Sequence, residues 1–108
     1  MEMVKQYDIY WISLDPTKGS EINKTRPGVI ISPDDSNKFL NTVIIAPLTS
    51  SFKNFPMRLE VSLNGKKGQV ALDQIRSIDK IRLLNKAGVL KASEIRNIRK
   101  ILREYLTE

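Results

Sequence analysis

Hydrophobic and polar residues alternate over short segments through most of the chain, with the period of two that is typical of half-buried β-strands. Met57–Leu63 (MRLEVSL) shows this alternation most cleanly, whereas Pro27–Ser32 (PGVIIS) is almost wholly apolar, as in a strand covered on both faces. The candidate strands are Tyr7–Leu14, Pro27–Ser32, Thr42–Leu48, Met57–Leu63 and Gly68–Ile75, with Ile81–Leu84 as a short addition.

Polar segments rich in turn-forming residues separate these candidate strands. Asn64–Gly68 (NGKKG) predicts a hairpin turn. Pro33–Asn41 (PDDSNKFLN) predicts a turn-rich connection that includes one helical turn. Asp15–Gly28 (DPTKGSEINKTRPG) is longer and more highly charged than a tight hairpin requires, so this loop needs an explanation beyond chain reversal.

The C-terminal segment changes to a helical period. Ser93 is the predicted N-cap, and Glu94 follows it in the first turn. The apolar stripe comprises Ile95, Ile98, Ile101, Leu102, Tyr105 and Leu106, and the other side carries Arg96, Arg99, Lys100 and Arg103. A basic helix of this kind can read nucleic acid, but its apolar stripe favours a helix that covers the open end of a small barrel. The pattern therefore predicts an α+β fold, a small SH3-like, mostly antiparallel β-barrel with a C-terminal α-helix, in one domain spanning residues 1–108.

Composition narrows the chemistry that is open to this chain. Cysteine is absent, which excludes disulfides and thiolate metal sites. Histidine is also absent, which removes the commonest general base and the commonest metal ligand. Catalysis would therefore depend on carboxylates, Lys, Arg, Tyr or hydroxyl groups.

The charge balance points to an anionic partner. The formal net charge is +6 on 108 residues, which favours nucleic acid, a membrane surface or an acidic protein, although a basic surface also serves solubility. We find no apolar run long enough to span a bilayer and no signal-peptide pattern at the N-terminus, so we expect a cytosolic protein without a membrane partner.

The hairpin formed by Pro27–Ser32 and Thr42–Leu48 brings two candidate functional residues together. If Pro33 pairs with Thr42, opposing residue numbers in the ladder sum to 75, and Arg26 faces Thr49. Directly opposed residues in an antiparallel pair have Cβ atoms about 5 Å apart. We therefore expect a guanidinium and a hydroxyl at the barrel rim, beneath the charged loop that carries Glu21.

These three groups suit phosphoryl chemistry. The Arg26 guanidinium presents a rigid fork of donors that matches phosphate oxygens, Thr49 can orient the same phosphate, and Glu21 could accept a proton from a nucleophile. On the evidence of these three residues alone, a structural ion pair that fixes the loop is an equally good explanation.

Four segments resemble, in order, the motifs of the MazF/PemK (also Kid) family of bacterial toxin endoribonucleases. They are DPTKGSE (Asp15–Glu21), RPGVIIS (Arg26–Ser32), APLTS (Ala46–Ser50) and DQIRSID (Asp73–Asp79). With the C-terminal helix, the resemblance covers nearly the whole chain. It implies the barrel fold that this family shares with the gyrase-inhibiting toxin CcdB, and it identifies the long charged loop as an RNA-handling element.

The resemblance implies a sequence-selective, metal-independent endoribonuclease without a cofactor, which cleaves single-stranded RNA, usually mRNA, and arrests translation and growth. The ribose 2′-OH would be the nucleophile, leaving a 2′,3′-cyclic phosphate and a 5′-OH end. Arg26 and Thr49 match the family's main catalytic pair, and Glu21 matches an acid implicated alongside them. We assign Arg26 to charge stabilisation, Thr49 to positioning of the phosphate and Glu21 to the role of general base.

Two positions depart from the family pattern. Thr25 stands where some relatives have histidine, so a relative that uses imidazole for proton transfer is a poor guide to this protein. Ala71 stands where some members carry a further arginine, so that phosphate contact is missing.

Further residues are candidates for RNA contact. The RNA-binding candidates are Lys18, Ser20, Lys24, Thr25, Ser50, Phe52, Lys53, Asp73, Gln74 and Arg76, and Arg82 is a further basic residue that could line the groove. Each basic residue taken alone is more often a solvated surface charge. Phe52 or Phe55 could stack a base or cap the core, Trp11 is expected in the core or a dimer interface, and Asp73 is expected to pair with Arg76.

The resemblance also implies partners. Family members form two-fold dimers, and their usual partner is an antitoxin whose acidic, disordered tail folds over the basic toxin and with which they bind DNA. Two alternatives remain on the sequence alone. One is a gyrase inhibitor of the same fold, although such toxins lack the pairing of RP with T-S, and the other is a non-catalytic nucleic-acid-binding barrel.

Overall fold

The computed structural model describes residues 3–13 and 25–107. Over these residues the strands are β1 (Asp8–Ser13), β2 (Thr25–Ile30), β3 (Thr42–Thr49), β4 (Arg58–Leu63), β5 (Lys66–Ala71), β6 (Arg76–Asp79) and β7 (Leu83–Val89). The helices are α1 (Asp34–Phe39) and α2 (Ala92–Thr107), and short 3-10 turns cover Leu72–Gln74 and Lys80–Arg82.

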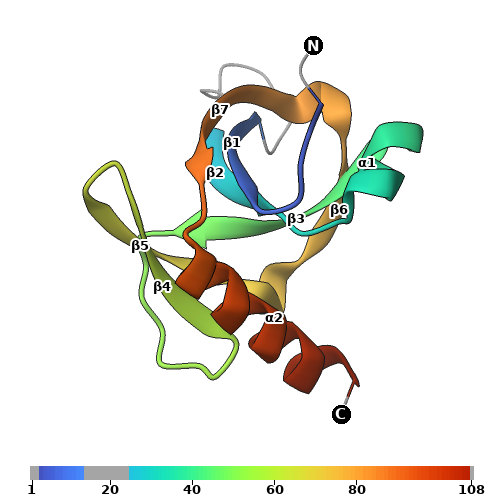
Figure 1. Ribbon diagram of the computed structural model, residues 1–108. Coiled ribbons are helices and arrows are strands. Elements are labelled where there is room, and N and C mark those ends of the chain that lie inside the picture. Colours follow the sequence, from blue (N-terminus) through green and yellow to red (C-terminus); the bar gives the residue numbers. More distant parts are fainter. Residues whose placement is uncertain (1–2, 14–24, 108) are drawn as a thin grey trace, which may run out of the picture.

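The described strands form one strongly curled antiparallel sheet in the order β4-β5-β3-β2-β1-β7, and β6 pairs with β3. Figure 1 shows β1, β2, β3, β6 and β7 curling around a common centre, while β4 and β5 extend away from it and α2 lies beside them. The predicted α+β fold, a small antiparallel barrel with a C-terminal helix, is confirmed.

Two hydrophobic clusters hold this arrangement together. One lies beneath α2, where Ile98 is fully buried against residues such as Val61 and Val70. The other fills the curl with side chains such as Ile30 and Ile45. Since burial of an aliphatic side chain of this size contributes about 1.5–3 kcal/mol, these clusters provide the main drive for the sheet to close around them.

The predicted register of the central hairpin is confirmed. Gly28 pairs with Pro47, Val29 with Ala46, and Ile30 with Ile45. The helical turn expected between β2 and β3 is present as α1. The predicted turn between β4 and β5 is also confirmed, because Asn64 and Gly65 both have positive φ (52° and 80°), as the primed turns of tight hairpins require.

The segment after β5 differs from the prediction. The strand expected over Gly68–Ile75 ends at Ala71, and a 3-10 turn bends the chain before β6. Both β5 and β6 pair with β3, with Thr49 opposite Gln69 and Ile45 opposite Arg76. The bend therefore lets one stretch of chain pair with both ends of β3, which a single straight strand could not do on a curled sheet.

The last strand was predicted in the wrong place. The short strand expected over Ile81–Leu84 is a 3-10 turn at Lys80–Arg82 followed by the longer β7. β7 pairs with β1 through two register shifts. Each shift moves side chains to the other face of the sheet, so the period-two pattern is lost in the sequence.

The helix was predicted to start two residues too late. Ile95 donates its backbone N–H to the carbonyl oxygen of Lys91 (2.9 Å), so Lys91 rather than Ser93 caps the helix. The Glu94 carboxylate accepts from the Lys91 N–H (2.8 Å), as in the second half of a capping box. Tyr105 and Leu106 are exposed rather than part of the buried stripe. Within residues 3–13 and 25–107, no helix is both long and apolar enough to cross a membrane.

Candidate active site

The ends of β2 and β3 open into a cavity of about 600 Å³. Arg26 and Thr49 both line it. The paired residues of β2 and β3 end at Gly28 with Pro47, and Arg26 and Thr49 each lie two residues further toward the same end of the hairpin. The structure therefore brings the two residues that the sequence analysis paired to one cavity, where Arg26 is exposed and Thr49 is half-buried.

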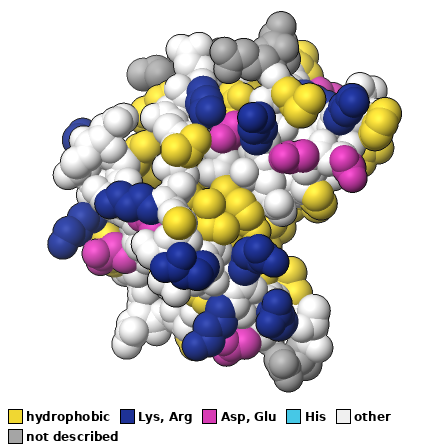
Figure 2. All heavy atoms as spheres, viewed as in Figure 1, with side chains coloured by type: hydrophobic (Ala, Val, Ile, Leu, Met, Phe, Trp, Pro, Cys, Tyr) yellow, Lys and Arg dark blue, Asp and Glu magenta, His cyan; other side chains and the backbone are white. Residues whose placement is uncertain are grey.

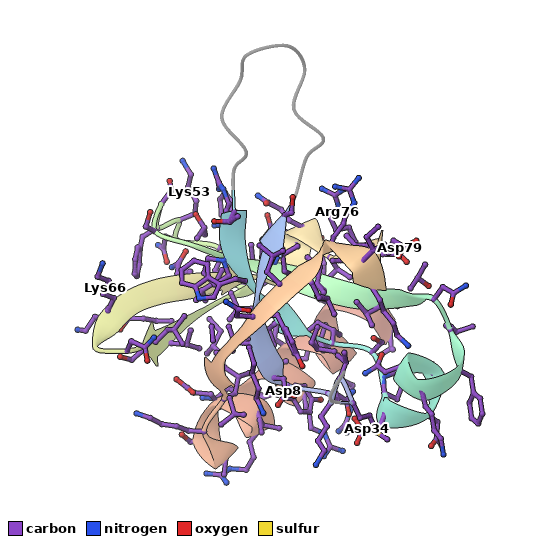
Figure 3. The ribbon with its side chains drawn as sticks, turned by 90° about the horizontal axis from the view of Figure 1, so that it is seen from above. Asp8, Asp34, Lys53, Lys66, Arg76 and Asp79 are labelled. Atoms are coloured by element: carbon purple, nitrogen blue, oxygen red, sulfur yellow. The ribbon has the colours of Figure 1, made fainter. Side chains whose placement is uncertain are left out.

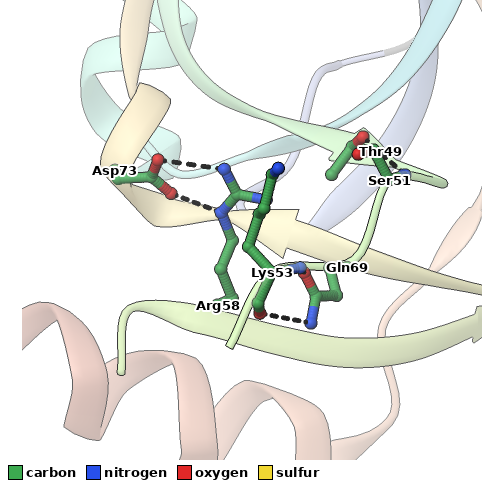
Figure 4. Close-up of polar contacts among 6 residues, drawn as sticks. All are labelled: Thr49, Ser51, Lys53, Arg58, Gln69 and Asp73. Atoms are coloured by element: carbon green, nitrogen blue, oxygen red, sulfur yellow. Dashed lines mark hydrogen bonds and ion pairs between the residues drawn. The ribbon is translucent and has the colours of Figure 1, made fainter. Parts of the chain in front are cut away.

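The Thr49 hydroxyl has a defined orientation. Its oxygen accepts a hydrogen bond from the backbone N–H of Ser51 (3.0 Å; Figure 4). A hydroxyl has one hydrogen to donate and two lone pairs. Because Ser51 uses a lone pair, the hydroxyl hydrogen is directed elsewhere and can donate to an anionic oxygen in the cavity. The hydrogen bond from Ser51 thus leaves the Thr49 hydroxyl hydrogen available to donate.

Several residues that the sequence analysis did not assign also line the cavity. Trp11 forms part of its wall and is 38% exposed, so it does not lie in the core, and the alternative of a dimer interface stays a prediction. The β4–β5 hairpin contributes Asn64, Lys66 and Lys67. The signal that could have identified Trp11 is its place on β1 directly opposite Pro27, since neighbouring strands place paired residues side by side.

Asp73 is paired with a different arginine from the one predicted. It accepts two hydrogen bonds from Arg58, at 2.6 Å from Nε and 3.1 Å from Nη2 (Figure 4). The Arg58 side chain is 5% exposed. The hydrogen bond from Arg58 lowers the pKa of Asp73, and the reciprocal bond raises the pKa of Arg58. The expected Asp73–Arg76 pair is therefore wrong, because Arg76 lies on β6 after the 3-10 turn and is exposed.

The loop between β3 and β4 borders the cavity, and side chains of β5 and β4 hold it in place. The Gln69 side chain bonds both backbone groups of Lys53, accepting from its N–H (2.9 Å) and donating to its carbonyl oxygen (3.1 Å). Arg58 lies over the Phe55 ring, 5.4 Å from its centre. Phe52 and Phe55 are 46% and 47% exposed, so of the two roles considered for them, neither residue caps the core, and base stacking stays a prediction.

The remaining predicted site residues fall into three groups. Thr25 and Ser50 are exposed at the ends of β2 and β3, and Ser50 lines the cavity. Gln74 and Arg76 are exposed at and after the 3-10 turn, and Arg82 donates to the carbonyl oxygen of Ser13 (3.2 Å). The predicted residues Lys18, Ser20, Glu21 and Lys24 lie outside the described residues.

Basic side chains lie on more than one surface. In Figure 3, Lys53 and Arg76 lie at the end of the molecule opposite Asp34, and Lys66 lies out to one side on the hairpin. Figure 2 shows Lys and Arg side chains gathered where α2 lies, and Arg96, Arg99, Lys100 and Arg103 line a shallow hollow there. Within residues 3–13 and 25–107, no three acidic residues cluster in a way that could hold a metal ion.

Comparison with known proteins identifies the family of this chain. The family model described as "PemK-like, MazF-like toxin of type II toxin-antitoxin system" matches residues 5–106. A curated relative, the endoribonuclease MazF of Staphylococcus epidermidis, is 35% identical over 99 residues, covering 86% of this chain and 82% of the relative.

Solved structures share the fold. A MazE-MazF crystal structure from Deinococcus radiodurans matches with a TM-score of 0.84 and 24% identity, over 98% of this chain and 97% of that one. An endoribonuclease from a mycobacterial species in complex with its cognate antitoxin matches with a TM-score of 0.81 and 20% identity, over 95% and 94% of the two chains. The chain belongs to the family of PemK-like, MazF-like toxins of type II toxin-antitoxin systems.

Proposed function

We propose that this toxin is a metal-independent, sequence-selective endoribonuclease that cleaves single-stranded mRNA and thereby arrests translation and growth. The observation that carries the proposal is that Arg26 and Thr49 line one open cavity in a chain of this toxin family. A cation beside a directed hydroxyl donor is suited to a phosphodiester, whose non-bridging oxygens become more negative during displacement.

The reaction is an internal displacement. The ribose 2′-OH loses its proton to a general base and its oxygen forms a bond to phosphorus. The bond from phosphorus to the 5′-oxygen breaks, and the leaving 5′-oxygen takes up a proton from solvent water. The products are a 2′,3′-cyclic phosphate and a 5′-OH end. Arg26 stabilises the charge on the phosphorane, Thr49 donates to a phosphate oxygen, and Glu21 acts as the general base. No step uses imidazole, in agreement with a chain that has no histidine.

The cavity walls suggest how RNA is held. Trp11 offers a partly exposed aromatic face next to Arg26 and Thr49, and base stacking on aromatic side chains is the usual way to hold single-stranded RNA. Lys66 and Lys67 also line the cavity, where they neutralise neighbouring phosphates. Phe52 and Lys53 contact the bases next to the scissile phosphate.

The proposal includes the partners expected for the family. The toxin works in the cytoplasm, where its substrate is, as a two-fold dimer with residues 1–108 of each chain forming one domain. The acidic tail of its cognate antitoxin covers the basic RNA-binding surface, and the net charge of +6 favours both partners. The complex of toxin and antitoxin binds DNA.

The test is cleavage of single-stranded RNA in the presence of EDTA, with mapping of both new ends. We expect cyclic-phosphate and 5′-OH ends. Arg26→Ala should abolish detectable cleavage, and Thr49→Ala should lower kcat by about 10²–10³-fold, as loss of one donor to a developing oxyanion does. Thr49→Ser keeps the hydroxyl and should retain most activity, and Arg96→Ala on α2 is the control for loss of a positive charge.

The outcomes separate this function from its alternatives. RNA that stays intact with or without divalent ions would remove the nuclease proposal. A gyrase inhibitor would leave RNA uncut and block DNA supercoiling instead. A non-catalytic binding barrel would retain RNA without cutting it.

A further inference from the structure

Gln69 is a buried polar residue whose side chain is directed at a loop rather than at its own sheet. It lies on β5 opposite Thr49 of β3, and 9% of its surface is exposed. Its amide oxygen accepts from the Lys53 N–H, and its amide nitrogen donates to the Lys53 carbonyl oxygen. Figure 4 shows this contact on the same side of the sheet as Thr49 and Ser51.

The primary amide makes this reciprocal pair because it carries an uncharged donor and an uncharged acceptor side by side. It imitates the pattern by which one strand residue bonds both backbone groups of its neighbour. A carboxylate of the same length keeps the acceptor but places negative charge against the Lys53 carbonyl oxygen. A methionine of similar length offers neither hydrogen bond. The contact is therefore specific to the chemistry of Gln69 and does not follow from its size.

The pair of hydrogen bonds between Gln69 and Lys53, which we call the clamp, lies at the centre of the β3–β4 loop. This loop directly follows Thr49, the proposed catalytic threonine. The loop is fixed at its start, where Ser51 bonds Thr49, and near its end, where Arg58 contacts the Phe55 ring. Between these points, Gln69 bonds the main chain at Lys53, so that the Lys53 side chain stays exposed next to the exposed Phe52. Figure 3 shows the Lys53 side chain directed outward.

We propose that Gln69 is a positioning residue for RNA specificity. By clamping Lys53, it holds Phe52 and the Lys53 ammonium where they contact the bases and phosphates flanking the cleaved bond. This role rests on the proposed ribonuclease function, and Gln69 itself touches neither the substrate nor the reacting atoms. By holding this loop in place, the buried Gln69 side chain thus determines which RNA sequence is cut.

The experiment compares Gln69→Glu and Gln69→Met with the parent protein on a panel of short RNAs. The panel carries every base at each position next to the parent's preferred cleavage site. Gln6→Glu is the matched control, because the Gln6 amide also donates to a backbone carbonyl (Ile31, 2.8 Å), and its backbone N–H is bonded to Asp34, which lies away from the loop (Figure 3).

For both Gln69 variants we expect the preference for the best RNA over its single-base variants, measured as a ratio of kcat/KM, to fall by about tenfold or more. A displaced contact of about 1 Å is enough for an effect of this size. KM for the best RNA should rise, while kcat at saturation should stay within about threefold of the parent, since Arg26 and Thr49 are untouched. Gln6→Glu should keep the parent's preference.

Three results would overturn the role of Gln69. They are an unchanged preference in a folded Gln69 variant, an equal loss of preference in Gln6→Glu, and a fall in kcat without a change in preference. If Gln69→Glu does not fold, the uncharged Gln69→Met variant decides the question alone. A parent protein that cuts no RNA would instead refute the ribonuclease function, so the two failures are distinguishable.

Discussion

Asp73 shows at the scale of one residue how its neighbours decide what a side chain does. The same carboxylate could serve as an acid, a base or a structural partner. Here it accepts two hydrogen bonds from a nearly fully buried arginine, which lowers its pKa. A carboxylate held in this way is a poor proton acceptor, so we assign Asp73 to supporting the base of the β3–β4 loop together with Arg58.

Asp73→Asn should lower the free energy of unfolding at pH 7 by about 3 kcal/mol, because removing one partner leaves the buried Arg58 cation uncompensated. The folded-state pKa of Asp73 lies below its unfolded value, so its contribution is complete above about pH 4–5 and is lost as the pH falls through the folded pKa. Urea unfolding from pH 7 to pH 3 should therefore show the difference between parent and variant shrinking with acid.

The control for this experiment is Glu104→Gln, an exposed carboxylate on α2 that should change stability by less than about 0.5 kcal/mol. A difference between Asp73→Asn and the parent that stays constant down to pH 3 would contradict the assignment. So would a difference that grows.

At the scale of secondary-structure elements, one side chain, that of Glu94, caps the start of α2. The Glu94 carboxylate accepts from the Lys91 backbone N–H at 2.8 Å and reaches the Ser62 N–H of β4 at 3.4 Å. It thereby caps the helix and joins it to the β4–β5 pair. Ser93, the cap expected from sequence, lies inside the first turn.

Glu94→Ala should reduce the free energy of unfolding by about 1 kcal/mol, since a helix start loses a capping hydrogen bond. Ser93→Ala should have a much smaller effect, because the Ser93 side chain does not cap the helix. Chemical denaturation of the two variants, with Glu104→Ala as the control on the same helix, measures the difference. The reverse order of effects would restore Ser93 as the N-cap.

At the scale of the whole molecule, two separate basic surfaces of the described residues are available to an anion. One is the hairpin side of the cavity, with Lys66 and Lys67, and the other is the exposed face of α2. Of these two surfaces, the proposed function places RNA on the first. Net charge therefore measures attraction to an anion, while the fold decides where the anion binds.

Salt dependence of RNA binding tests that division. In a Thr49→Ala background, which suppresses cleavage, Lys66→Gln with Lys67→Gln should reduce the slope of log affinity against log salt by about 1.4, since each phosphate neutralised on single-stranded RNA contributes about 0.7. Arg96→Gln with Lys100→Gln removes the same charge from α2 and should change the slope little. An equal reduction by both pairs would show that RNA binding is not confined to the cavity.

Local patterns predict much of this protein. The apolar runs on either side of a short connection specify the β2–β3 register, and that register is what brings Arg26 to Thr49. The NG turn and the amphipathic C-terminal segment likewise predict the β4–β5 hairpin and α2. These features depend on residues close in sequence, where the strand and helix periods and the turn preferences act directly.

Contacts between side chains distant in sequence were not predictable in the same way. Arg58 meets Asp73, Gln69 bonds Lys53, and Trp11 faces the cavity because β5 and β6 share one edge of β3 on a curled sheet while β1 lies beyond β2. No local period records which strands become neighbours or where a strand bends. The pattern of residues thus specified the elements and the proposed catalytic pair, whereas packing in three dimensions chose the partners that support them, since side-chain neighbours follow from how the curled sheet buries its core.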